Sequence, residues 1–156
     1  MTDIIYRTNI LDNLITVIQG IDQRDGYNFN IGQDSVSKIL KSAQAVTSSD
    51  LPMLFISDGP ETMIYEMGSR VGNHFNVIIR GIVEDENNPS GELNKLIADV
   101  SKAILVDPKR GTDSNGNPNA GNTKILRIST DQGLASPRAI FEMEIETVYY
   151  TLDQAR

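Results

Sequence analysis

The 156-residue chain contains no cysteine, no tryptophan and a single histidine, His74. The lack of cysteine excludes disulfides, thiolate metal sites and cysteine nucleophiles, and it fits a reducing compartment such as the cytosol. One histidine cannot form a His-rich metal site, and no serine lies in the Gly-x-Ser-x-Gly motif of a hydrolase. Phosphate-binding glycine motifs are also missing. We therefore predict a protein that is not an enzyme, with no catalytic, cofactor-binding or metal-binding residues.

Long hydrophobic runs and excess positive charge are lacking too. No run approaches 18 apolar residues, so we expect no membrane-spanning helix, and the acidic N-terminus (Asp3) is not typical of a signal peptide. Twenty-one acidic residues against 14 basic ones give a formal net charge of −7, which disfavours tight contact along nucleic acid. With 39% hydrophobic residues, the composition is that of a globular protein, and we predict a single domain over residues 1–156.

Two segments have clear helical periodicity. Apolar residues recur at helical spacing over 3–20, and Asn88-Pro89 begins a second helix that runs to residue 106, where Asp107-Pro108 ends it. A third, shorter helix is predicted over 34–43.

Strand-like alternation is more frequent. It predicts strands at 27–31, 52–56, 61–67, 75–83, 124–128 and 140–150, with a turn at 57–60. The strands at 61–67 and 75–83 are expected to form a hairpin, and the last two an antiparallel pair. The final strand could extend over 138–151, which is roughly 45 Å at ~3.3 Å per residue. The predicted fold class is α+β, with a mainly antiparallel sheet and two or three helices packed on it.

The segment 107–122 is rich in Gly, Pro and Asn, and we predict a mobile loop there. Asp113, Asn115 and Asn117 alternate as calcium ligands do. However, an EF-hand would need glycine and glutamate where Pro118 and Lys124 stand. We interpret the segment as a candidate docking loop, with these residues as its candidates: Lys109, Arg110, Asp113, Asn115 and Asn117.

Acidic residues form the other conspicuous pattern. Alternation in the last strand places Glu142, Glu144 and Glu146 on one face, and Glu84-Asp85-Glu86 closes an earlier strand. Such a row is typical of a solvated face, and it also suits an interface or the wall of a lumen. A catalytic carboxylate pair is the third interpretation, although such pairs usually converge from different elements.

The order of these patterns resembles that of the tail terminator (tail-completion) proteins of tailed bacteriophages. The resemblance rests on an opening helix, the Leu51-to-Ile56 strand with Asp58-Gly59-x-Glu61 after it, the helix over 93–104 and the closing Tyr149-Tyr150. Asp25-Gly26-Tyr27 and the strand over 75–83 also contribute, so that the resemblance covers most of the chain.

By this resemblance, the chain would form a homo-oligomeric ring, expected to be hexameric, at the end of the tail tube. The ring would stop tube growth and present the surface for head joining. The implied partners are further copies of the chain, the tail tube protein and a head-completion or neck protein, and DNA would only pass through the lumen. The implied location is the tail of the virion, after synthesis in the host cytoplasm, with no membrane contact. No catalytic residue and no cofactor are implied. The candidate lumen or interface residues are Glu84, Asp85, Glu86, Glu142, Glu144 and Glu146.

Other interpretations remain open at this stage. A neck or head-completion connector of the same particle would share the acidity and the lack of catalytic motifs. A soluble partner-binding module of a cellular assembly is a second alternative. A small hydrolase or metal enzyme built on the acidic residues is a third.

Overall fold

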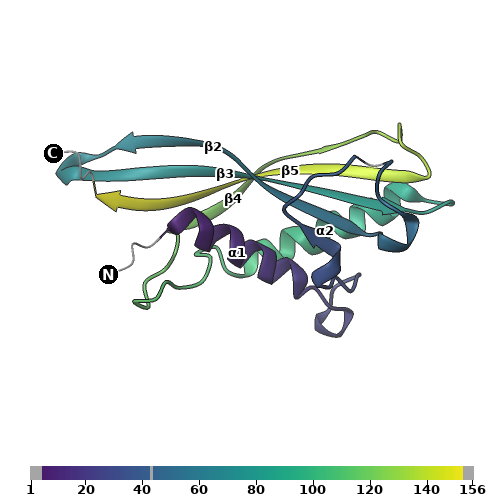
Figure 1. The fold of residues 1–156 in the computed structure, drawn as a ribbon, viewed down its shortest axis with the longest axis horizontal. Coiled ribbons are helices and arrows are strands. Elements are labelled where there is room, and N and C mark those ends of the chain that lie inside the picture. The colour runs from purple at the N-terminus through teal and green to yellow at the C-terminus, as the bar shows by residue number, and fades with distance from the viewer. Residues whose placement is uncertain (1–4, 43, 153–156) are drawn as a thin grey trace.

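The computed structural model describes residues 5–42 and 44–152. It consists of one five-stranded sheet, in the order β1-β2-β3-β5-β4, with two helices packed against one face (Figure 1). The helices are α1 (Tyr6–Gln19) and α2 (Pro89–Val106). The strands are β1 (Val36–Ser37), β2 (Met53–Tyr65), β3 (Arg70–Glu84), β4 (Asn122–Thr130) and β5 (Arg138–Leu152). Four single-turn 3-10 helices lie at Gln23–Asp25, Gln33–Ser35, Ser48–Asp50 and Met67–Ser69.

The longest pairing joins β3 to β5, antiparallel and in continuous register from Arg70↔Leu152 to Glu84↔Arg138. Antiparallel pairing also joins β2 to β3 and β4 to β5, as the sequence predicted. The short β1 runs parallel to β2, through Val36↔Leu54 and Ser37↔Phe55. The α+β class is therefore confirmed, and the sheet is mixed because of this one parallel pair.

The main core lies between the sheet and the two helices. Along β5, Phe141, Met143 and Ile145 are buried on the helix side, as the period of two predicted. The helices contribute an apolar stripe each, and burial of one such side chain stabilises the fold by ~1.5–3 kcal/mol. The helical core residues are Ile10, Leu14, Ile18, Leu93, Leu96, Val100 and Ile104.

A second, smaller core lies on the opposite face of the sheet. Phe55 of β2 and Ile82 of β3 point to that face and pack with Met53 and Val46. The chain before β2 therefore covers one end of the sheet that the helices leave open.

The helix over 88–106 begins and ends as predicted, and the Asn88 side chain accepts a hydrogen bond from the Gly91 amide at 3.1 Å. The opening helix is also confirmed, although its predicted start at Asp3 lies outside the described residues. The strands predicted at 124–128 and 140–150 are present and longer, over β4 and β5.

The strand predicted at 27–31 is wrong. The amide groups of Asn28 and Phe29 donate to the buried Asp99 carboxylate on α2, at 2.9–3.0 Å, in place of a neighbouring strand. A helix side chain thus takes the donors that a sheet would have used. The segment lies against the helical layer without joining the sheet.

The third helix, predicted over 34–43, is also wrong. Its first residues form a 3-10 turn and then β1, whose pairing with β2 is non-local and leaves no local signal. Ile39 and Leu40, which the helical pattern would have buried, are exposed. Residue 43 lies outside the described part of the chain.

The turn predicted at 57–60 is replaced by a bulge within a single strand, β2. Gly59 and Pro60 lie opposite Asn76 alone, between the pairs Asp58↔Val77 and Glu61↔Phe75. Pro60 is tolerated because β1 ends earlier, so that this part of β2 is an edge needing no amide on its outer side. The actual reversal comes at Met67–Ser69, where Gly68 has a φ of 78°.

One polar cluster ties α1 to the sheet. The Tyr149 hydroxyl donates to Glu61 Oε1 at 2.8 Å, and its ring stacks on Tyr6 with centroids 5.6 Å apart. Arg7 lies over the Phe75 ring, 4.5 Å from its centroid. Burial, followed by the hydrogen bond to Glu61, raises the pKa of Tyr149.

We expect Tyr149→Phe to lower the free energy of unfolding by about 1–3 kcal/mol at neutral pH, because the largely buried Glu61 carboxylate loses its donor. Above about pH 10 an unfolded tyrosine releases its proton, whereas the folded Tyr149 keeps it. The raised pKa of Tyr149 therefore stabilises the folded state fully below about pH 10. This stabilisation falls progressively as the pH rises further. The free energies of unfolding of wild type and variant, measured with urea from pH 7 to 11, should converge as the pH rises.

Tyr65→Phe, at an exposed ring, is the control. A difference between wild type and Tyr149→Phe that persists at high pH would contradict the prediction.

Candidate functional site

The acidic row of β5 lies on the sheet face away from the helices. Within 4 Å, β3 offers a polar partner to each member. Arg80 Nη2 is 3.8 Å from Glu142 Oε2, Asn76 Nδ2 donates to Glu144 Oε1 at 2.9 Å, and His74 Nδ1 is 3.2 Å from Glu146 Oε1. The structure thus brings the three predicted glutamates together and pairs them with side chains that the sequence did not link to them.

Basic residues border this row on its other side. Lys124 and Arg127 of β4 stand opposite Glu146 and Glu144 in the sheet register, so they share its face. Both are exposed, and neither forms an ion pair with a residue that the structure describes. The charge of this face is therefore graded, with acidic residues on β5 and basic ones at the β4 edge.

The second acidic group, Glu84-Asp85-Glu86, divides into three roles. Glu84 ends β3 and lies 3.5 Å from Arg138 Nε. Asp85 Oδ1 accepts the amides of Asn87 and Asn88 at 2.8 Å, which fixes the turn into α2. Those hydrogen bonds lower the pKa of Asp85. Glu86 is exposed, so it is the member of this group most open to a partner.

The segment between α2 and β4 is organised around Arg110. This side chain is fully buried, and its Nη2 donates to the carbonyl oxygens of Ile104 and Asp107 at the end of α2. A cation is favoured there because the last helical carbonyls carry partial negative charge. Burial lowers the pKa of the Arg110 guanidinium, and Asp107 opposes this shift. Arg110, a predicted docking residue, therefore lies inside the loop and not on its surface.

Asp113 organises the tip of the same segment. Its Oδ1 accepts the amides of Asn115 and Asn117, at 2.8 and 3.0 Å, and the side chain is buried. The alternating Asp113, Asn115 and Asn117 therefore form a turn, in which the Asp113 carboxylate accepts the amides of the two asparagines. Among the predicted docking residues, the exposed ones are Lys109, Asn115 and Asn117.

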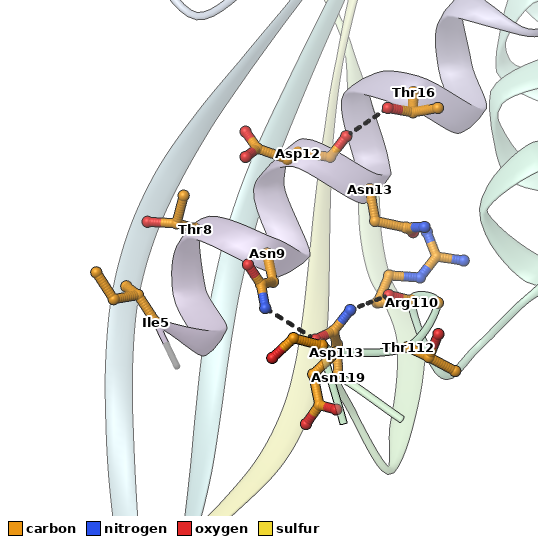
Figure 2. A pocket seen from close by; sticks show the side chains of 12 residues that line it. Ile5, Thr8, Asn9, Asp12, Asn13, Thr16, Arg110, Thr112, Asp113 and Asn119 are labelled. Atoms are coloured by element: carbon orange, nitrogen blue, oxygen red, sulfur yellow. Dashed lines mark hydrogen bonds between the residues drawn. The ribbon is translucent and has the colours of Figure 1, made fainter. Parts of the chain in front are cut away.

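A hollow of about 760 Å³ lies between this loop and α1 (Figure 2). Asn9 Nδ2 donates to Asn119 Oδ1 across it at 3.1 Å, and Asn13 and Arg110 also line it. Arg110 Nε and Nη1 are buried without a hydrogen-bond partner among the described residues. The hollow is lined by charges of both signs, Arg110 with Asp12 and Asp113, so it does not select an anion or a cation.

Beyond the first turn of α1, strands β2, β3 and β5 continue with no helix among the described residues packed on them (Figure 1). We call residues 62–72 of β2, β3 and the turn between them, together with residues 150–152 of β5, the sheet extension. It carries apolar side chains in solvent, with Met67 98%, Tyr65 66% and Leu152 65% exposed. Ile64 and Met63 are about half exposed as well. Sequence reasoning missed this surface, because alternation marks a strand but does not show where the covering helix ends.

We expect Arg110→Met to lower the free energy of unfolding by about 1–3 kcal/mol, because the carbonyls at the end of α2 lose a charged donor while the volume is kept. Arg110→Ala should cost more, since it also leaves a cavity. Hydrogen exchange should quicken first over 107–121. Lys109→Ala, at the exposed neighbour, is the control and should stay within ~0.5 kcal/mol of wild type. Unchanged exchange in both Arg110 variants would contradict the capping role.

These observations define a class of protein, a small α+β subunit whose distinctive features are surfaces for contact. The described residues include no group of three or more His, Asp or Glu side chains placed to hold a metal ion. None of the helices within those ranges is long and apolar enough to cross a membrane.

The chain belongs to the bacteriophage tail tube terminator family, whose model matches residues 4–156. It is thus a structural protein of a phage tail, a component of the virion that assembles with other phage structural proteins. No curated protein matches the chain. Among solved structures, it is similar to a chain in the virion of a native gene transfer agent particle, with a TM-score of 0.47 and 11% identity. That similarity covers 76% of this chain and 81% of the other.

Proposed function

We propose that the protein forms a closed ring, expected to be hexameric, on the last ring of the tail tube, where it stops tube growth and presents the surface for head joining. The family match over nearly the whole chain is the observation that carries this proposal. An open tube end keeps adding subunits as long as it offers the surface that the previous ring offered. A cap ends growth by matching the tube on one side and not on the other.

The exposed surfaces support this role. The sheet extension offers uncovered apolar area of the kind that marks protein contacts. The loop over 107–121 is a candidate for docking through Lys109, Asn115 and Asn117, whose exposed side chains could adjust on contact. Its interior, held by Arg110 and Asp113, would keep the contact surface in shape.

The acidic row suits the wall of a lumen through which DNA passes. Repulsion between like charges would keep phosphates from adhering to these carboxylates, while Arg80, Lys124 and Arg127 on the same face lower its net negative charge. Glu142, Glu144 and Glu146 are our candidates for this wall, together with Glu84 and Glu86 at one end of the same region. The partners Arg80 and His74 would hold the carboxylates in place.

The proposal is tested by growing tubes from the purified tail tube protein with and without this chain. We expect a broad distribution of tube lengths by electron microscopy without the chain, and short tubes with one blunt, capped end when it is present. Adding tube protein afterwards should not lengthen the capped ends. Capped tubes that still elongate would contradict the proposal, and binding to portal-side components in place of tube ends would indicate a neck connector.

The lumen assignment makes its own prediction, which compares two triple variants of equal charge. Glu142→Lys/Glu144→Lys/Glu146→Lys reverses the row, and Asp25→Lys/Asp34→Lys/Asp50→Lys reverses three exposed carboxylates outside it. On capped tubes, we expect the first variant to bind a short DNA duplex at least about tenfold more tightly than the second, with a steeper salt dependence. Fluorescence anisotropy over a salt series measures both quantities. Equal affinities would show that the row does not face the DNA path.

A further inference from the structure

The sheet has two different free edges, one at each side. On one side, no strand among the described residues pairs with β2 from Ser57 to Tyr65, because β1 ends at Ser37. On the other side, β4 is the last strand. Each edge therefore presents unpaired backbone groups along several residues, which is where chains commonly add to one another.

Both edges also carry apolar side chains in solvent. The β2 side belongs to the sheet extension, where Ile64, Tyr65 and Met67 are exposed. On β4, Leu126 is 49% exposed, and we call it together with Lys124 and Arg127 the β4 patch. Ile128, which is 40% exposed, pairs with Met143 and therefore lies on the helix side of the same edge. Leu126 is the extra residue of a bulge between the pairs of Ile125 and Arg127, which turns it outward.

The two edges differ in charge: the β4 patch is basic, whereas the carboxylates on the β2 side are paired with arginines. The β4 patch holds the exposed Lys124 and Arg127, which form no ion pair with a described residue. The β2 side holds Asp58 and Glu66, whose partners Arg7 and Arg70 are partly exposed. Exposed pairs of this kind are weak, so their carboxylates can exchange partners when a second basic surface approaches.

From this we infer that the sheet extension of one copy packs on the β4 patch of the next copy. The contact rests on the proposed ring and names its subunit interface. Apolar residues meet apolar residues, and the basic β4 side chains meet the carboxylates of Asp58 and Glu66. Because the two surfaces are different, the contact is head-to-tail and leaves a free copy of each surface at its ends. Such contacts are the ones that close into rings.

The absence of cysteine from the chain gives a clean test by cross-linking. Single-cysteine variants Tyr65→Cys, Met67→Cys and Leu126→Cys are mixed in pairs at ring-forming concentration, alone and on capped tubes, with a short bismaleimide. We expect Leu126→Cys to cross-link with Tyr65→Cys or Met67→Cys. Leu134→Cys, at a residue 92% exposed elsewhere, is the matched control and should not cross-link with either.

Each outcome decides the inference. Efficient linking of Leu126→Cys to the sheet extension, without the control product, supports it. Linking of Met67→Cys only to itself would show a two-fold contact between extensions and overturn it. Linking of Met67→Cys to single cysteines introduced into the tube protein, without linking to Leu126→Cys, would assign the extension to the tube and overturn it as well. Rings that form without a Leu126→Cys product would overturn it too.

A second measurement uses charge and polarity. Tyr65→Asp/Met67→Asp should raise the concentration needed for half-assembly by at least about tenfold, as measured by native mass spectrometry, whereas Leu134→Asp should not. Glu66→Lys alone and Lys124→Glu/Arg127→Glu alone should each weaken assembly. Combining all three substitutions in one chain exchanges the charges of the two surfaces and should restore part of that loss. The thermal unfolding of each monomer is recorded, so that misfolding is not mistaken for a lost contact. No loss of assembly in the folded aspartate variant would overturn the inference.

The contact and the capping function fail in different ways. If wild type forms rings and caps tubes while no cross-link joins the extension to the β4 patch, the inference is wrong and the function stands. If the cross-link forms but tubes elongate regardless, the contact stands and the capping function is wrong. If neither is seen, both are wrong.

Discussion

The uninterrupted pairing of β3 with β5 is the constraint on which the rest of the structure depends. Fifteen residues in each strand span about 50 Å at ~3.3 Å per residue, whereas the 14 residues of α1 and 18 of α2 span only about 21 and 27 Å. The helices therefore cover only part of the sheet. The chain before β2 covers one end of the opposite face with a small core of its own, and the far end of the sheet keeps its apolar side chains in solvent.

The parts of the fold that sequence predicts are those with a long local period. The helix over 89–106 and the alternation of Phe141, Met143 and Ile145 have such periods, and both are found as predicted. The errors at 27–31, 34–43 and 57–60 share one cause, since distant residues decide each segment. Asp99 takes the amides of the first, β2 recruits the second as a parallel strand, and β3 pairs through the third.

Sequence reasoning located some residues of the candidate surfaces but not their partners or their burial. The acidic row follows from alternation alone, so its position on one face was accessible to sequence reasoning. Its partners on β3 and its basic neighbours on β4 were not, because register depends on turns and bulges. Arg110 looked like an exposed loop residue. Its burial follows from where α2 ends, since the last carbonyls of that helix need donors and the folded-back Arg110 side chain supplies one.

The bulges in β2 and β4 have a consequence for how copies of this chain can aggregate. A flat, regular edge strand is a template for unlimited sheet growth, and a concentrated virion component with two open edges would be prone to fibres. Gly59-Pro60 in β2 and Leu126 in β4 each break the hydrogen-bonding ladder of an edge. Neither edge can then direct a long in-register stack, and amyloid-type growth is suppressed by backbone geometry while the side chains stay free to select a partner.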